Sequence, residues 1–242
     1  MPGWRDGLQA SSLYLAVPLS RPGGQIGIIT FGKTGRQPNK LPAVVNGAEV
    51  LDSAFDPFDP SVIAAGRIGR EASPRGEERR QRRCEPAVAR ASCVVGARTA
   101  CEDGAVRIWR IPEGGLTKDI DEPALKISAH SQRINIVAFH PLAKDVLITT
   151  AAEYPESTIK YWNAATGELL QTITGFKDLV FGFAHSFDGA RLAVASKDGR
   201  LRVFDARSGA LLQEGPSHEG SRGARVLWLG DTNRLLTVGW NK

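Results

Sequence analysis

Residues 103–109 read Asp-Gly-Ala-Val-Arg-Ile-Trp, and a similar phrase returns twice further along the chain. The second copy is Ser-Thr-Ile-Lys-Tyr-Trp at 157–162, and the third is Asp-Gly-Arg-Leu-Arg-Val-Phe at 198–204. Each copy is a run in which apolar and polar residues alternate, and each ends on an aromatic residue. Alternation with a period of two is typical of a β-strand. The phrase therefore predicts equivalent strands in a repeating β structure.

A second phrase marks the other half of each repeat. It reads Phe-Asp-Pro at 55–57, Phe-His-Pro at 139–141 and His-Ser-Phe-Asp-Gly at 185–189. Trp162 and Phe204 lie 42 residues apart, which fits the period of a four-stranded WD-type propeller blade. We therefore expect an all-β fold, an incomplete WD-repeat β-propeller with about three whole blades and partial blades at either side.

The repeat is interrupted between Phe55 and Phe139, which lie too far apart for one blade and slightly too close for two. Residues 66–100 supply the surplus, with nine Arg and four Glu but no Lys, no Asp and no aromatic residue. A segment of this composition cannot bury enough apolar surface to fold. We expect an Arg-rich disordered insert within a blade. It is either a retained intron or gene-model error, which we favour, or a functional insert.

The expected organisation follows from this interruption. Residues 1–12 are expected to be an unstructured N-terminal segment, and residues 13–65 and 101–242 to form the partial propeller on both sides of the insert at 66–100. Residues 13–17 and 25–31 are expected to be the last two strands of a first blade, and residues 44–55 to open the next one.

Composition and charge exclude several classes of function. The chain has a net charge of +5, and residues 66–100 supply all of it, so the blades have no basic face of the kind that binds nucleic acid. No run of 18 apolar residues predicts a membrane span. The three cysteines and four histidines lack the spacing of a metal site or a disulfide framework. We expect no metal, no cofactor and no enzymatic activity, and a cytoplasmic location.

In WD repeats a buried His, a Ser or Thr, an Asp and a Trp form a hydrogen-bond relay within the blade. The best set here is His130, Thr149 or Thr150, and Trp162. In the next blade Phe176 replaces the His and Phe204 the Trp. The structural blade residues that we predict are Asp103, Trp109, His130, Trp162, Ser196, Asp198 and Phe204. Two cations, Arg133 and Lys177, each precede the first strand of a blade and are a possible partner surface.

Longer strings are similar to the coronin family of actin-associated WD-repeat proteins. They are Phe-Asp-Pro-Phe-Asp-Pro at 55–60, Glu-Asp-Gly-Ala-Val-Arg-Ile-Trp-Arg-Ile-Pro-Glu-Gly-Gly-Leu at 102–116 and Phe-His-Pro-Leu-Ala at 139–143. Residues 213–226 resemble the long coronins, which carry two propellers in tandem, and the match is with part of the second propeller. Residues 1–12 do not match the basic N-terminal signature of the family, so no actin-contacting residue is transferred to this chain.

The resemblance implies part of a seven-bladed propeller that acts as a scaffold. It implies protein partners, with binding to actin filaments, organisation of the actin cytoskeleton and Golgi-linked vesicle traffic as the cellular role. The alternative is another WD-repeat scaffold, such as a substrate receptor of a ubiquitin ligase or a coat component. The sequence leaves open which partner binds, which rim is used and the oligomeric state.

Overall fold

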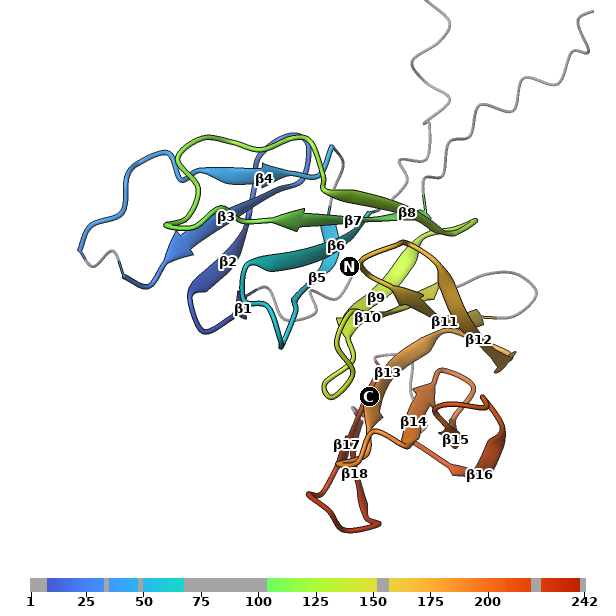
Figure 1. Ribbon diagram of the computed structural model, residues 1–242. Helices are drawn as coiled ribbons and strands as arrows, with labels where there is room; N and C mark the ends of the chain where they lie inside the picture. Colours follow the sequence, from blue (N-terminus) through green and yellow to red (C-terminus); the bar gives the residue numbers. More distant parts are fainter. Residues whose placement is uncertain are drawn as a thin grey trace, which may run out of the picture.

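The computed structural model describes residues 8–32, 35–47, 50–67, 104–151, 157–218 and 223–239. All of its regular secondary structure in these ranges is β-strand. Figure 1 shows the strands grouped into small sheets that follow one another along a curve, from β1–β4 in blue to β17–β18 in red. The predicted residue Asp103 and nearly all of the expected insert at 66–100 lie outside the described residues.

The strands form four sheets of four antiparallel strands and one sheet of two. The first sheet holds β1 (Gln9–Ala10), β2 (Tyr14–Leu19), β3 (Gln25–Thr30) and β4 (Ala43–Val45), and the second holds β5 (Val50–Phe55), β6 (Val62–Arg67), β7 (Gly104–Arg110) and β8 (Leu125–His130). The third holds β9 (Ile134–Phe139), β10 (Val146–Ala151), β11 (Ser157–Asn163) and β12 (Leu169–Phe176). The fourth holds β13 (Val180–His185), β14 (Arg191–Ser196), β15 (Arg200–Asp205) and β16 (Leu211–Pro216), and a hairpin of β17 (Ala224–Trp228) and β18 (Leu235–Gly239) follows.

In the three middle sheets the second strand is buried on both faces, because a neighbouring sheet covers each of them. In β14, Leu192 and Val194 belong to the core shared with the third sheet, whereas Ala193 and Ala195 belong to the core shared with the β17–β18 hairpin. All four side chains are fully buried. Since successive side chains of a strand point to opposite faces, a continuous apolar run suits this position better than strict alternation.

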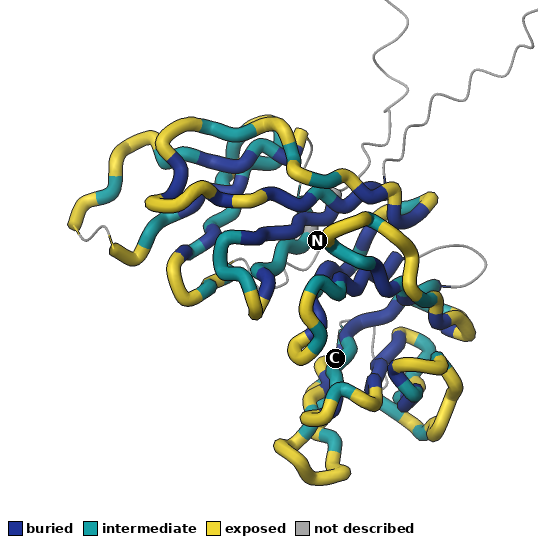
Figure 2. The backbone as a smooth tube through the Cα atoms, viewed as in Figure 1, coloured by how far each residue is buried: buried dark blue, intermediate teal, exposed yellow. Residues whose placement is uncertain are grey.

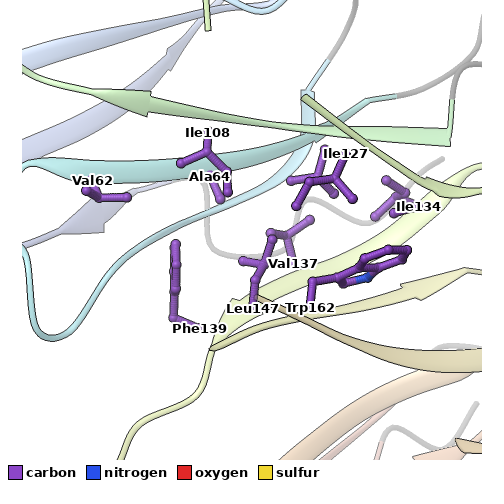
Figure 3. Packing of buried hydrophobic residues seen from close by; sticks show 11 residues of the cluster. Val62, Ala64, Ile108, Ile127, Ile134, Val137, Phe139, Leu147 and Trp162 are labelled. Carbon is purple, nitrogen blue, oxygen red and sulfur yellow. The ribbon is translucent and has the colours of Figure 1, made fainter. Parts of the chain in front are cut away.

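The core is therefore divided into clusters between consecutive sheets. Figure 3 shows the cluster between the second and third sheets, where Val62 and Ile108 of one sheet face Phe139, Leu147 and Trp162 of the other. Dark blue segments in Figure 2 mark the same pattern along the strand interiors, whereas the yellow exposed segments lie mostly at turns and outer strands. Burial of apolar surface between the sheets is the main force that holds them together.

Single hydrogen bonds also tie the first strands of neighbouring sheets. Val137 N donates to Asp52 Oδ2 at 3.0 Å between β9 and β5. Asn135 Nδ2 donates to the Val180 carbonyl at 2.7 Å between β9 and β13. Trp228 Nε1 donates to the Ala184 carbonyl at 3.1 Å between β17 and β13. These bonds fix how far one sheet is displaced along the next.

The first sheet has more strands than the sequence predicted, and their order in the sheet is different. Residues 9–10, expected to be unstructured, pair with β2 as the short first strand β1. As a result β2 and β3 are the second and third strands of the sheet and not the last two. Ala43–Val45, expected to open the next blade, pairs with β3 as the fourth strand, β4. The first sheet consequently has four strands, although its two outer ones are short.

The long connection between β7 and β8 is ordered along the edge of the first sheet. Val45 N donates to the Ile120 carbonyl at 2.7 Å, and Ile120 N donates to the Ala43 carbonyl at 2.9 Å. Ala43 N also donates to Asp119 Oδ1 at 3.0 Å. This connection covers the free edge of β4. An exposed strand edge is a site of unwanted pairing, so covering it protects the sheet.

Candidate functional site

Two of the predicted blade residues, His130 and Trp162, form a buried relay between the second and third sheets with Thr149, one of the two threonines expected to join them. His130 ends β8, Thr149 lies within β10 and Trp162 lies in β11. Trp162 Nε1 donates to Thr149 Oγ1 at 2.9 Å, and His130 Nε2 lies 2.8 Å from the same oxygen. All three side chains are buried. The hydroxyl of Thr149 therefore joins an imidazole of one sheet to an indole of the next.

The second sheet has the indole of this relay without its acceptor. In the second sheet Trp109 pairs with Ile63, and in the third sheet the equivalent Trp162 pairs with Leu147. Thr149 lies two residues after Leu147, so its equivalent in the second sheet is Ala65, two residues after Ile63. Ala65 offers no hydroxyl, and Trp109 Nε1 is buried without a hydrogen-bond partner. A buried donor left unpaired in this way costs free energy of folding.

The fourth sheet replaces the whole relay with apolar side chains. Phe176 ends β12 and occupies the position that His130 occupies at the end of β8. Phe204 pairs with Leu192, and this pair corresponds to Trp162 and Leu147 in the third sheet. Both Phe rings are buried. The acceptor position that Thr149 fills is Val194 here, so none of the three relay positions carries a polar side chain in this core.

The two predicted polar residues of the fourth sheet, Ser196 and Asp198, bind Arg202. Arg202 Nη1 donates to Ser196 Oγ at 2.8 Å, and Arg202 Nη2 lies 2.7 Å from Asp198 Oδ2 and 3.2 Å from a Glu214 oxygen. Burial alone would raise the pKa of Asp198, but hydrogen bonds from Arg202 and Ser196 outweigh it and lower that pKa. This network holds the turn between β14 and β15.

A cluster that we did not predict lies between the third and fourth sheets. The rings of His140 and His185 have centroids 4.3 Å apart, and His185 Nε2 lies 3.1 Å from the Tyr161 hydroxyl. His140 Nδ1 accepts hydrogen bonds from Leu142 N at 3.1 Å and Ala143 N at 2.9 Å. This imidazole is therefore neutral, with its proton on Nε2. The available signal was the recurrence of His at the ends of equivalent strands, which we interpreted only as a repeat marker.

Burial dominates the protonation of this cluster. It lowers the pKa of His185 to about 3, and the neighbouring His140 acts in the same direction. Burial also lowers the pKa of His140, against a hydrogen bond with Gly189 that raises it. The pKa of Tyr161 is raised by burial. Both imidazoles are neutral at pH 7, and their rings form a packing contact between two sheets.

The two ends of the strands define two rims. We call the first rim the side that carries the turns before the first strand of each sheet, and the second rim the side with the turns between first and second strands. Arg133 and Lys177 are both exposed and lie on the first rim, before β9 and β13. The structure does not bring them into a pocket with any other predicted residue. Among the described residues, no group of three or more His, Cys, Asp or Glu could hold a metal ion.

Comparison with known proteins shows a WD-repeat fold. Residues 167–205 match the family model "WD domain, G-beta repeat". The chain aligns over 97% of its length with the WD40 domain of Toxoplasma gondii coronin, covering 52% of that chain at 22% identity with a TM-score of 0.73. The expected all-β, WD-repeat propeller fold is confirmed. The matched repeat begins just before β12 and ends with β15, so the sequence repeat is offset by one strand from the sheet.

Sequence comparison also gives coronins as relatives of this chain. The chain is 36% identical to Coronin-7 of Rattus norvegicus over 99% of its own length, which is 22% of that relative. It is 29% identical to the coronin-like protein of Saccharomyces cerevisiae over 97% of its length, which is 32% of that relative. The chain thus spans between a fifth and a third of these relatives. Its described residues contain no helix that could cross a bilayer.

Proposed function

Since this is a coronin-family WD-repeat chain, we propose that it works as a non-enzymatic scaffold that binds protein partners in the actin cytoskeleton. The observation that carries the proposal is the similarity to coronins over 99% of the chain. The architecture agrees with it, because the polar clusters inside the sheets hold turns or join sheets. Their donors and acceptors are directed at one another and not at a shared cavity.

The finer parts of the proposal are the partner and the location. We propose that actin filaments are the partner, and that the protein acts in the cytoplasm, on the cytoskeleton and in Golgi-linked vesicle traffic. The coronin resemblance supports both. The other WD-repeat roles that the sequence leaves open, a ubiquitin-ligase receptor or a coat component, share the fold and differ only in partner.

Cosedimentation with actin filaments tests the proposal. The chain is incubated with a rising concentration of filaments and centrifuged, and the bound fraction is measured at 50 and 200 mM salt. Saturable pelleting that persists at the higher salt supports actin as the partner. Pelleting that does not saturate, or that disappears at 200 mM salt, contradicts it, because nonspecific attraction to an acidic filament is screened at that ionic strength.

A further inference from the structure

The threonine of the buried relay recurs in the β17–β18 hairpin, which we call the fifth sheet. β18 begins with Leu235, which lies opposite the last residue of the first strand of its sheet. Leu147 of β10 has the same position in the third sheet. Thr237 and Thr149 each lie two residues further along their strand. Thr237 is therefore the equivalent of the relay threonine.

An imidazole contacts this threonine as it does in the relay. His218 Nε2 lies 3.1 Å from Thr237 Oγ1, and His130 Nε2 lies 2.8 Å from Thr149 Oγ1. His218 comes two residues after β16, and His130 ends β8. Both strands are the fourth of their sheets, so the two histidines also correspond. The fifth sheet thus holds two members of the relay, joined through the same ring nitrogen.

No described residue of the fifth sheet occupies the tryptophan position of the relay. In the third sheet Trp162 lies on the third strand, and its Nε1 donates to Thr149 Oγ1 at 2.9 Å. The described part of the fifth sheet has two strands, so no described third strand covers the pair. His218 is exposed and Thr237 is half-buried, whereas His130 and Thr149 are buried. The pair is therefore accessible to a further strand.

The outer edge of β18 has the backbone groups that such a strand needs. Leu229 N donates to the Arg234 carbonyl at 3.0 Å just before β18. Since hydrogen-bonded and non-hydrogen-bonded pairs alternate in an antiparallel ladder, the backbone groups of Leu235 and Thr237 point away from β17. No described strand pairs with this edge. An extended segment bound there places one residue opposite Leu235, the position that the relay gives to tryptophan.

The fourth sheet leaves room for an indole beside this edge. In the relay, Trp162 packs with Val106 and Ile127 of the preceding sheet. The equivalent residues of the fourth sheet are Leu201 and Gly215, which are also cross-strand partners. Leu201 provides an apolar wall next to the hairpin. A Cβ at Gly215 would meet no atom within 4 Å, so the space above this residue is open.

We propose that the outer edge of β18 is an acceptor site for an extended segment of a partner protein that carries a tryptophan. The segment adds to the hairpin as a third strand through main-chain hydrogen bonds with Leu235 and Thr237. Its indole lies opposite Leu235 and donates to Thr237 Oγ1, which completes the relay with His218. This inference goes beyond the scaffold role, because it names a surface and a ligand side chain that do not depend on actin.

Fluorescence anisotropy tests the proposal with a labelled peptide that has the sequence of β11, Ser157–Asn163, and therefore carries the relay tryptophan. A second peptide with Phe in place of this Trp keeps an aromatic ring and lacks the indole N–H. We expect the whole chain to bind the Trp peptide saturably. Thr237→Val removes the acceptor oxygen and keeps the shape of the side chain. It should weaken binding of the Trp peptide about fivefold, the equivalent of one hydrogen bond, and leave binding of the Phe peptide unchanged.

The matched control is Thr172→Val, which removes an exposed threonine hydroxyl from the outer strand β12. It should leave the affinity for both peptides unchanged. Absence of saturable binding by the unaltered chain overturns the proposal. An unchanged affinity of T237V for the Trp peptide, or equal weakening of both peptides by T237V, also overturns it. Filaments are not used, so this result is independent of the actin test.

Discussion

Phe176 and Phe204 pack with their ring centroids 5.3 Å apart, at the two positions that His130 and Trp162 occupy one sheet earlier. The polar relay of the third sheet is therefore exchanged as a set in the fourth. A joint exchange leaves no buried donor without an acceptor, which is the costly outcome of changing one partner alone. Arg202, whose guanidinium carbon lies 6.0 Å from the centroid of the Phe176 ring, donates its hydrogen bonds to Ser196 and Asp198 instead.

Thr149→Val should destabilise the chain, because it leaves Trp162 Nε1 without its acceptor and removes the oxygen shared with His130. We expect a loss of about 1–3 kcal/mol in the free energy of unfolding, measured by urea denaturation. Thr150→Val is the matched control. Thr150 is equally buried, and its hydroxyl has no hydrogen-bond partner, so its removal should be neutral or stabilising. Equal losses in both variants would contradict the relay.

Ala65→Ser should stabilise the second sheet. The added hydroxyl stands where Thr149 stands in the third sheet, and Trp109 Nε1 lacks a partner. A new buried hydrogen bond contributes about 1 kcal/mol, although Ala65 is fully buried and the added oxygen must find room. The gain should vanish when Trp109 is changed to Phe. A double-mutant cycle on the free energy of unfolding measures it, and a coupling of zero would contradict the assignment.

The imidazole of His185 should make the chain sensitive to acid. Its pKa is lowered by burial from 6.5 to about 3 in the folded chain, so below pH 6.5 the unfolded chain takes up a proton that the folded chain does not. Stability is fully present above pH 6.5 and falls by about 1.4 kcal/mol per pH unit as the pH drops from there toward 3.

Urea denaturation at pH 7.5, 6.0 and 5.0 measures this slope. His185→Gln keeps a side chain that can hydrogen-bond to Tyr161 and cannot titrate, so we expect the variant to lose stability less steeply with acid. An unchanged slope in H185Q would show that His185 does not titrate as its burial implies.

The repeat was predictable from the sequence because its signal is local. The turn, the alternating strand and the terminal aromatic residue all lie within seven residues, as at 198–204. The sequence repeat is displaced by one strand from the four-stranded sheet, and this displacement was not predictable from a local sequence signal. Whether Ala43–Val45 pairs with β3 or opens the next sheet depends on edge hydrogen bonds with Ile120 and Asp119, which are far away in the sequence.

The residues of the candidate site also divide into those that a local sequence pattern predicts and those that it does not. His130, Thr149 and Trp162 were identified together because a known blade pattern joins them, and the structure places them within hydrogen-bond distance. The contact of His140 with His185 has no pattern of its own, since it needs the relative placement of two sheets.

The hairpin of β6 and β7 should fold without the Arg-rich stretch that follows β6. Gly66 pairs with Val106, so Arg67 stands opposite Ala105, and a short loop can join the two strands. Replacing residues 68–102 by one Asn leaves Asn and Asp103 as a short connection from Arg67 to Gly104, the first residue of β7. Gly104 is kept because a Cβ there would meet the His130 and Gln132 carbonyl oxygens. Since loop-closure entropy grows with loop length, the shortened chain should be about 2 kcal/mol more stable.

Circular dichroism and thermal unfolding check this prediction. The strand signal should be unchanged and the melting temperature should rise. A Gly/Ser segment of the original length in place of residues 68–102 is the control for length. It should return the melting temperature to that of the unaltered chain, because loop length would then be restored without the arginines. Loss of cooperative unfolding in the shortened chain would show that residues 68–102 contribute to the folded sheet, and it would rule out the interpretation of this stretch as an insert.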